Sequence, residues 1–260
     1  MSQAAPILRE IKSIFNSQGI NNDVQIASHL GFLLLVRQHW EQIRAVRDYR
    51  ELNEIFEHLQ RTLEYEIYRS PLLPTPPNRQ LKHDNLYVII RVLELLESAI
   101  AAATVRTIGD FFQYEIRFEI LKDVRRESYP TPHHVANFMA ALGVKHNDPS
   151  TKIIDLTAGT GGLLAAALSY APDAELIGYD YDPNIAQLGI TNLLLHRQSN
   201  VMFYPESAFT LAERWYEPSF DTVLMNPPFG GTRSAGEVER LQWHFFDENY
   251  GRSTHTLLLL

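Results

Sequence analysis

The stretch "IIDLTAGTGGLLAAA", residues 153–167, decides how the second half of this 260-residue chain is expected to fold. Its apolar start predicts a strand, its glycines predict a tight turn, and its leucines and alanines predict a helix. Gly159, Gly161 and Gly162 let the backbone turn sharply and bring peptide N–H groups close to a ligand. The stretch therefore predicts a ligand-binding loop between a strand and a helix.

Three kinds of ligand loop share this outline. A phosphate-binding P-loop would need Gly-Lys followed by Ser or Thr, which is absent here. A dinucleotide-binding loop would need a glycine at position 164, where Leu164 stands. The third is the loop of a methyltransferase that binds S-adenosylmethionine, in which an acid lies four residues before the first glycine, as Asp155 does. A purely structural turn remains an alternative to all three.

The residues around the loop repeat its alternation of strand and helix. Short apolar runs occur in "TKIIDLTA", "ELIGYD", "NVMFYP" and "FDTVLMN", with helical segments between them, including a short one near residues 211–215. Such runs separated by helices indicate a parallel sheet with crossover connections. The prediction is an α/β fold with about four parallel strands. A helix with an apolar face at Val135, Phe138, Met139 and Leu142, ending at Gly143, precedes them.

The first half of the chain reads as helical. Apolar side chains recur at helical spacing in five segments, near residues 7–15, 26–43, 49–68, 85–102 and 108–126. The stretch "SPLLPTPPNRQ", residues 70–80, holds four prolines and reads as a linker. The sequence thus predicts a helical N-terminal domain over residues 1–128 and a second domain over residues 129–260.

Composition narrows the class of protein. The chain has no cysteine, which excludes disulfides and thiolate metal sites, and its histidines lack the spacing of a zinc-binding helix. No apolar run approaches the ~20 residues that span a bilayer, so a soluble protein is expected, and the lack of cysteine fits a cytoplasmic setting. The formal net charge is −8. A protein that binds nucleic acid unaided usually has a basic surface, so a partner would have to supply much of any phosphate affinity.

Acidic residues follow the second and third predicted strands. Asp180 ends the second strand about 20 residues beyond the glycines, where a carboxylate can accept both ribose hydroxyls of a nucleotide. Asp182 is the alternative, but it precedes Pro183 and is better suited to cap a helix. Glu206 could accept from an adenine amino group, or be an ordinary exposed acid.

Four motifs in this order resemble the N6-adenine DNA methyltransferases. They are "SYPTPHHV" (128–135), "DLTAGTGGLL" (155–164), "GYDYDP" (178–183) and "NPPFG" (226–230). Within that family the chain looks most like the modification subunits of type I restriction–modification systems. The motifs cover roughly residues 105–260, and the earlier helical region resembles those subunits in character only. Protein-glutamine and ribosomal RNA methyltransferases share the Asn-Pro-Pro-aromatic motif.

The resemblance implies a Rossmann-like methyltransferase fold with S-adenosyl-L-methionine as cofactor. It also implies a set of contacts to that cofactor. Thr131 and Pro132 would close over its methionine end, Asp155, Ala158, Gly159, Gly161 and Gly162 would cradle methionine and sugar, Asp180 would hold the ribose, and Glu206 would border the adenine. The chain departs from the family pattern at three positions: Leu156 replaces a common proline, Glu206 a common aspartate, and Pro130 a common aromatic residue.

The same resemblance assigns the catalytic motif. The Asn226 side chain and the Pro227 carbonyl would grip the target amine, with Pro228 keeping the backbone rigid and Phe229 stacking on a flipped adenine. Two acceptors on its N–H bonds would pull the amine toward tetrahedral geometry and aim its lone pair at the methyl group. Alignment and charge complementarity then drive the reaction, without a metal or covalent intermediate.

The implied function is site-specific methylation of adenine N6 in double-stranded DNA, within a restriction–modification or related defence system. The implied partners are a specificity subunit and a restriction subunit or second methyltransferase fragment. The family sheet has seven strands, so the four found here predict the N-terminal portion of a methyltransferase. The alternatives are an amide or amine methyltransferase acting on protein or RNA, and a non-catalytic remnant that binds cofactor or a partner.

Overall fold

A computed structural model describes residues 2–67, 73–74, 76–77, 86–122, 131–144, 150–196, 200–208 and 220–227. The chain forms two compact units. One consists of Met1–Val124 with Ile190–Ser199, and the other of Arg125–Gly189 with Asn200–Leu260. The inclusion of residues 190–199 in the first unit was not apparent from the sequence. Most of the predicted linker at 70–80, and the short helix near 211–215, lie outside the described residues.

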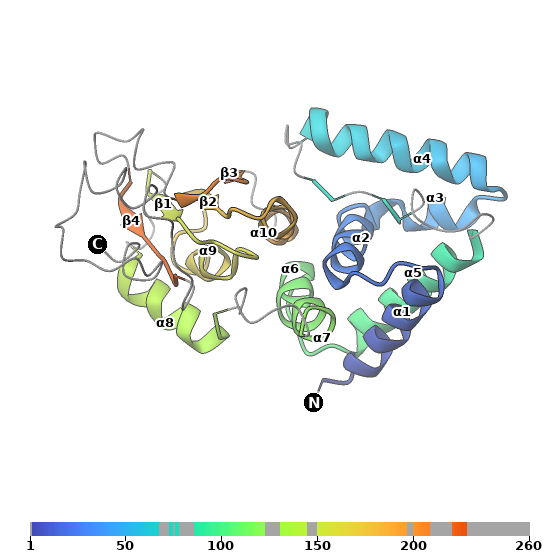
Figure 1. The fold of residues 1–260 in the computed structure, drawn as a ribbon, viewed down its shortest axis with the longest axis horizontal. Coiled ribbons are helices and arrows are strands. Elements are labelled where there is room, and N and C mark those ends of the chain that lie inside the picture. The colour runs from blue at the N-terminus through green and yellow to red at the C-terminus, as the bar shows by residue number, and fades with distance from the viewer. Residues whose placement is uncertain are drawn as a thin grey trace, which may run out of the picture. The chain divides into compact units, whose positions relative to one another are not determined.

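The first unit is helical, which confirms the prediction for this half of the chain (Figure 1). Its elements are α1 (Ala5–Ser17), α2 (Asp23–Leu35), the 3-10 turn η1 (Arg37–His39), α3 (Trp40–Ala45), α4 (Tyr49–Arg61), the π-helical turn η2 (Thr62–Ile67), α5 (Leu86–Ala102), α6 (Ile108–Asp110), the π-helical turn η4 (Phe111–Ile116) and α7 (Arg117–Ile120). Polar caps set two of the starts: Asn22 Oδ1 accepts from Val24 N at 2.9 Å, and Asp48 Oδ1 accepts from Arg50 N at 2.8 Å.

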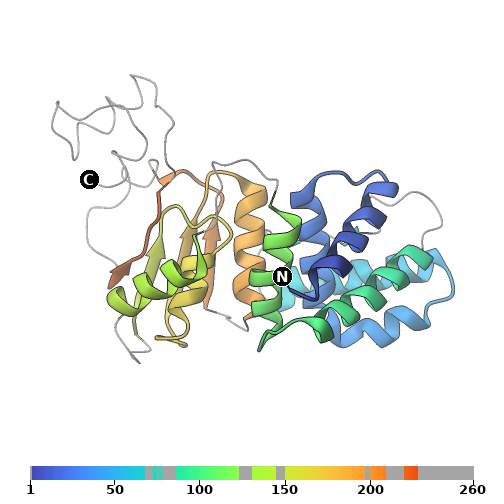
Figure 2. The same cartoon turned by 90° about the horizontal axis from the view of Figure 1, so that it is seen from below.

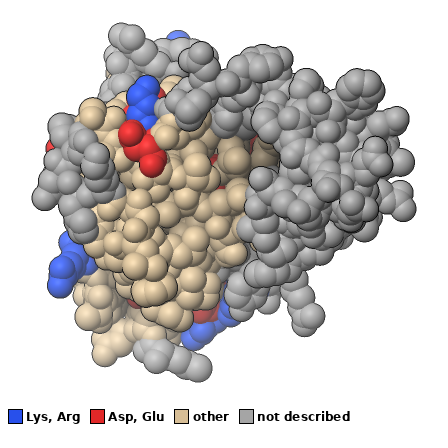
Figure 3. All heavy atoms as spheres, turned by 90° about the vertical axis from the view of Figure 1, so that its left-hand side faces the viewer, with Lys and Arg blue, Asp and Glu red and all other residues tan. Residues whose placement is uncertain are grey.

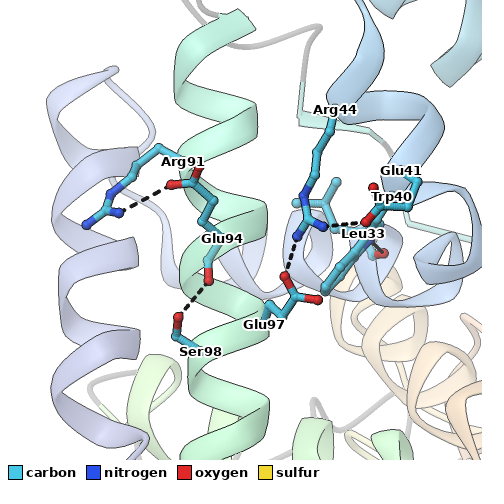
Figure 4. Close-up of polar contacts among 8 residues, drawn as sticks. All are labelled: Leu33, Trp40, Glu41, Arg44, Arg91, Glu94, Glu97 and Ser98. Atoms are coloured by element: carbon cyan, nitrogen blue, oxygen red, sulfur yellow. Dashed lines mark hydrogen bonds and ion pairs between the residues drawn. The ribbon is translucent and has the colours of Figure 1, made fainter.

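Helix α2 is the centre of this unit. Every residue from Ile26 to Leu34 is buried, because the segment is apolar on nearly all sides. Phe32 of α2 meets Phe56 of α4 edge to face, with ring centroids 5.5 Å apart. At the surface, Arg44 pairs with Glu97 at 2.6 Å and so links α3 to α5 (Figure 4). Exposed ion pairs contribute little, so apolar burial around α2 holds the unit together.

The second unit contains a four-stranded parallel sheet, as predicted (Figures 1 and 2). The strands are β1 (Lys152–Asp155), β2 (Glu175–Tyr179), β3 (Val201–Tyr204) and β4 (Thr222–Val223), in the order β3-β2-β1-β4. Helix α8 (His133–Gly143) precedes the sheet, α9 (Gly162–Ala167) joins β1 to β2, and α10 (Pro183–Leu195) joins β2 to β3. Because the strands are parallel, their carboxyl ends share one edge of the sheet.

The apolar face identified on α8 from the sequence is largely exposed, and only Met139 in it is half-buried. Val135, Phe138 and Leu142 are 37%, 64% and 73% exposed, whereas Ala136 and Ala140 are buried. Helix α8 packs against α9, and Ala136 and Ala140 form its buried side, where small side chains allow close packing. The larger apolar side chains are left on the outer side. Figure 3 shows the side of the molecule that lies at the left of Figure 1, where most of the described side chains in view are uncharged.

Candidate active site

The glycine loop joins β1 to α9 in a conformation that requires glycine. Gly159 and Gly161 have positive φ angles of 54° and 75°, in the left-handed region that disfavours other residues. Gly161 N donates to Ala158 O at 2.8 Å to close the turn, and Gly161 O accepts from Ala165 N at 2.9 Å as α9 begins. The strand, turn and helix predicted from this stretch are therefore confirmed, and Gly162 is the first residue of the helix.

Asp180 connects the ends of β1 and β2. Its Oδ2 accepts from Gly159 N at 3.1 Å and its Oδ1 accepts from Asp182 N at 2.9 Å. Ala158 N also donates to Tyr179 O at 2.8 Å, so the glycine loop is attached to the end of β2 at two points. Each carboxylate oxygen retains capacity for a further hydrogen bond, which is what a pair of ribose hydroxyls requires.

Asp182 has the capping role that the sequence favoured for it. Its Oδ1 accepts from Asn184 N at 2.8 Å, and its backbone carbonyl accepts from Ala186 N at 2.9 Å as α10 starts. Of the two acids, Asp180 is the one that contacts the glycine loop.

Asp155 is a buried carboxyl group at the end of β1. It is 1% exposed, and its Oδ1 accepts from Thr157 N at 2.9 Å. Burial raises the pKa of Asp155 to about 7, the nearby Asp180 charge acts in the same direction, and the hydrogen bond from Thr157 opposes them. Burial also raises the pKa of Asp180. The two acids and the N–H-rich loop fit a cofactor that carries positive charge on its methionine part and hydroxyls on its sugar.

Two further glycines, Gly178 and Gly189, pack closely against Phe203, and Gly189 also packs against the glycine loop. A Cβ atom at Gly189 of α10 would lie 2.9 Å from the Gly159 carbonyl oxygen and 2.3 Å from Phe203 Cζ. A Cβ atom at Gly178 of β2 would meet the same Phe203 ring at 2.5 Å. Helix α10 therefore lies directly against the loop only because position 189 has no side chain. Gly189 was not predicted from the sequence, although a glycine inside a helical pattern signals close packing.

Asn226 and Pro227 follow β4, at the same edge of the sheet as the glycine loop. Strand β4 pairs with β1 through Ile154↔Val223, and Leu224 N donates to Ile154 O at 2.9 Å. The chain then reaches Asn226, which is half-buried, and Pro227, which is buried. The predicted cofactor loop and the start of the predicted amine-binding motif thus follow neighbouring parallel strands.

Thr131, which is distant in the sequence, contacts the amine-binding motif that begins at Asn226. Asn226 Nδ2 donates to Thr131 Oγ1 at 3.0 Å across a separation of 95 residues. Pro132 is exposed and is the N-cap of α8. The structure thus places Thr131 against the amine-binding motif, a contact that the sequence did not suggest.

The remaining predicted site residues are Glu206, Pro228 and Phe229. Glu206 is half-buried two positions beyond the end of β3, at the same edge of the sheet. Pro228 and Phe229 lie outside the described residues. In the described part of the chain, no group of three or more His, Cys, Asp or Glu side chains is arranged to hold a metal ion, and no helix is long and apolar enough to cross a membrane.

Comparisons with known proteins identify the family. Residues 106–252 match the model of the N-6 DNA methylase family. The chain is 33% identical over 138 residues to the rRNA N(6)-adenosine-methyltransferase Mettl5 of Drosophila melanogaster, covering 52% of this chain and 64% of that protein. It is 28% identical over 178 residues to the type I restriction enzyme EcoEI methylase subunit of Escherichia coli, covering 58% of this chain and 32% of that subunit. The chain thus spans less than two thirds of either relative.

The solved structures agree on the fold. The type I restriction–modification methyltransferase subunit of Streptococcus thermophilus matches 100% of this chain and 71% of its own, with a TM-score of 0.58 at 15% identity. This confirms the predicted Rossmann-like methyltransferase fold with its helical N-terminal part. S-adenosyl-L-methionine, predicted as cofactor, is the methyl donor of this fold. The chain belongs to the N-6 DNA methylase family, and its fold is that of the type I modification subunits.

Proposed function

We propose that this chain transfers a methyl group from S-adenosyl-L-methionine to the N6 amine of an adenine in double-stranded DNA. The observation that carries the proposal is the pairing of β4 with β1. Because of this pairing, Asn226 and the glycine loop follow neighbouring parallel strands at one edge of the sheet, where Asp180 accepts a hydrogen bond from Gly159 N. Membership of the N-6 DNA methylase family supports the choice of an adenine amine as the target.

The cofactor supplies an electrophilic methyl group on a sulfonium, and the chain's own residues bind and orient it. Asp155 and the glycine loop receive the methionine and sugar, with loop N–H groups as donors and the buried carboxyl group favouring positive charge. Asp180 accepts the ribose hydroxyls while it keeps its bond to Gly159 N. Glu206 accepts from the adenine amino group of the cofactor.

The target amine is held by two acceptors. The exocyclic nitrogen of adenine is a poor nucleophile because its lone pair is delocalised into the ring. Asn226 Oδ1 and the Pro227 carbonyl accept hydrogen bonds from its two N–H groups. These bonds draw the nitrogen toward tetrahedral geometry, so that its lone pair faces the methyl group. Pro228 and Phe229 keep the roles expected from the sequence, a rigid backbone and a stacking surface for the flipped base.

Binding to DNA is proposed to depend on partner subunits. The chain carries 31 acidic and 23 basic side chains, which is unfavourable for holding a phosphate backbone unaided. A specificity subunit would supply the recognition sequence and much of the phosphate affinity, and a restriction subunit or second methyltransferase fragment would complete the assembly. The likeness to the EcoEI methylase subunit and to the Streptococcus subunit supports this arrangement.

Methylation of RNA is the second candidate. It is favoured by the 33% identity to Mettl5, which is a methyltransferase of adenosine N6 in ribosomal RNA. The amine and the two acceptors would be the same, and only the surroundings of the base would differ. A protein amide is a third target that the same pair of acceptors could hold.

The test compares these substrates directly. The purified chain is incubated with S-adenosyl-L-methionine and an adenine-containing DNA duplex, an RNA of the same sequence, or a glutamine peptide. Mass spectrometry of the digested products then measures N6-methyladenine and methylglutamine. The expected result is N6-methyladenine in DNA, lost in Asn226→Ala and retained in Asn16→Ala, which changes an exposed residue of α1. Methylation confined to RNA or peptide rejects the DNA proposal, and full activity of Asn226→Ala rejects the role of that residue.

A further inference from the structure

Helix α8 is attached to the β4 segment at both of its ends. At its C-terminal end, Thr222 Oγ1 donates to Gly143 O at 3.0 Å, and a Cβ atom at Gly143 would lie 3.1 Å from Leu224 Cδ2. At the other end, Thr131, two residues before the helix, accepts from Asn226 Nδ2 at 3.0 Å. The N-terminal end of α8 thus lies at Asn226, after β4, and the C-terminal end of α8 lies at Thr222, where β4 begins.

The lengths of the two elements fit this antiparallel arrangement. The 11 residues of α8 rise about 16 Å. The five residues from Thr222 to Asn226, which begin with the strand Thr222–Val223, reach about 13 Å when extended. Helix α8 therefore lies antiparallel to this segment. One hydroxyl–backbone contact and one hydroxyl–amide contact join the two at their ends. The packing of α8 against α9 holds the helix in place.

We propose that Thr131 is a positioning residue that fixes the orientation of the Asn226 side-chain amide, which rests on the role of Asn226 in the proposed function. The amide has its nitrogen and oxygen on opposite sides of one planar group. Donation from Nδ2 to Thr131 therefore turns Oδ1 away from Thr131 and leaves it as an acceptor. The reversed amide would present two N–H donors to the target amine, which also donates, and could not hold it.

This role differs from the cofactor contact that the family resemblance implies for Thr131. A residue that binds the methionine end of the cofactor affects cofactor affinity. A residue that orients Asn226 affects the rate of methyl transfer and leaves cofactor affinity nearly unchanged, because the acceptor is used on the target amine. The hydroxyl of Thr131 is the group that matters in both cases, so the measured quantity distinguishes them.

The variants are Thr131→Val, which removes the hydroxyl with little change in shape, and Thr131→Ser, which keeps it. Thr222→Val is the matched control, since it removes the hydroxyl at the other end of α8. Thr131→Val is expected to lower kcat about 10- to 100-fold, the cost of a misplaced reacting group. Calorimetry is expected to give an unchanged Kd for S-adenosyl-L-methionine in all three. Thr131→Ser is expected to restore the rate, and Thr222→Val to keep it.

A second readout does not depend on activity. The side-chain amide resonances of Asn226, identified as the pair missing from Asn226→Asp, are recorded in a nitrogen–proton spectrum of the full chain. They are expected to shift in Thr131→Val and to return in Thr131→Ser. Unchanged resonances in Thr131→Val, or a weakened Kd with an unchanged kcat, would overturn the proposal. If the wild-type chain methylates no adenine, the proposed function fails while the spectrum still decides whether Thr131 fixes the amide.

Discussion

Asp180 at the end of β2 accepts a hydrogen bond from Gly159 N, 3.1 Å away in the loop after β1, across 21 residues of sequence. The acid predicted to hold the ribose and the loop predicted to hold the methionine therefore form one connected structure. Any displacement of one displaces the other.

The Asp180→Asn variant is expected to weaken S-adenosyl-L-methionine binding about 10- to 100-fold, because hydrogen bonds to a charged group contribute about 1.5–3 kcal/mol. An amide has one acceptor oxygen in place of two, so it cannot serve Gly159, Asp182 and the ribose together. Titration calorimetry measures the change. Asp182→Asn is the control, since asparagine caps helices as well as aspartate does and affinity is expected to hold. Equal losses in both variants would contradict the assignment of the ribose to Asp180.

Substitution of the two glycines that face Phe203 is expected to give different results. In Gly189→Ala the new methyl group meets both Phe203 and the Gly159 carbonyl, so the glycine loop must move. In Gly178→Ala the closest atoms, at 2.5–2.9 Å, all belong to the Phe203 ring. Both variants are expected to unfold at lower temperature, because overpacking costs about 1–3 kcal/mol. Only Gly189→Ala is expected to weaken cofactor binding by about 10-fold or more.

Thermal unfolding and calorimetry on the same two samples check this prediction. Adding Phe203→Leu to each variant relieves the contact with the ring. Stability is then expected to recover in both, while the affinity of the Gly189→Ala double variant stays low because the Gly159 carbonyl is still displaced. Recovery of affinity along with stability would show that Gly189 acts only through the core.

The buried carboxyl group of Asp155 is expected to make stability depend on pH. Its pKa in the folded chain, about 7, lies above its ordinary value of 3.8, so the folded state binds the proton more tightly than the unfolded state. The stabilising contribution is therefore fully present below pH 3.8 and is lost as pH rises through about 7. The free energy of unfolding is expected to fall by at most about 1.4 kcal/mol per pH unit in this window.

Urea unfolding of the wild type and of Asp155→Asn, measured at intervals from pH 4 to pH 8, isolates this effect. As the pH rises across this window, the unfolding free energy of the wild type is expected to fall relative to that of Asp155→Asn. Asp180, whose pKa is also raised by burial, remains in both proteins and cancels to first order. A difference that is independent of pH would show that Asp155 does not titrate in this range.

Much of the fold and part of the site follow from local patterns. The glycine loop, four strands and an acid at the end of β2 were all predictable, because strand and turn preferences depend on neighbouring residues. The cap at Asp182 was predictable for the same reason. The exposure of the large apolar side chains of α8 was not predictable from local patterns. Periodicity shows which residues share a helix face but not whether another element covers that face, and Ala136 and Ala140 are the buried side chains of α8.

By itself, the sequence determined the parallel α/β fold, the family and the identity of the candidate site residues, since these depend on short motifs read in order. Only the tertiary structure decided that Thr131 contacts Asn226 and that Gly189 supports the glycine loop. Both contacts join residues that are distant in sequence. They depend on how closely α8 and α10 pack against the sheet, which is fixed by the volumes of side chains on several elements at once.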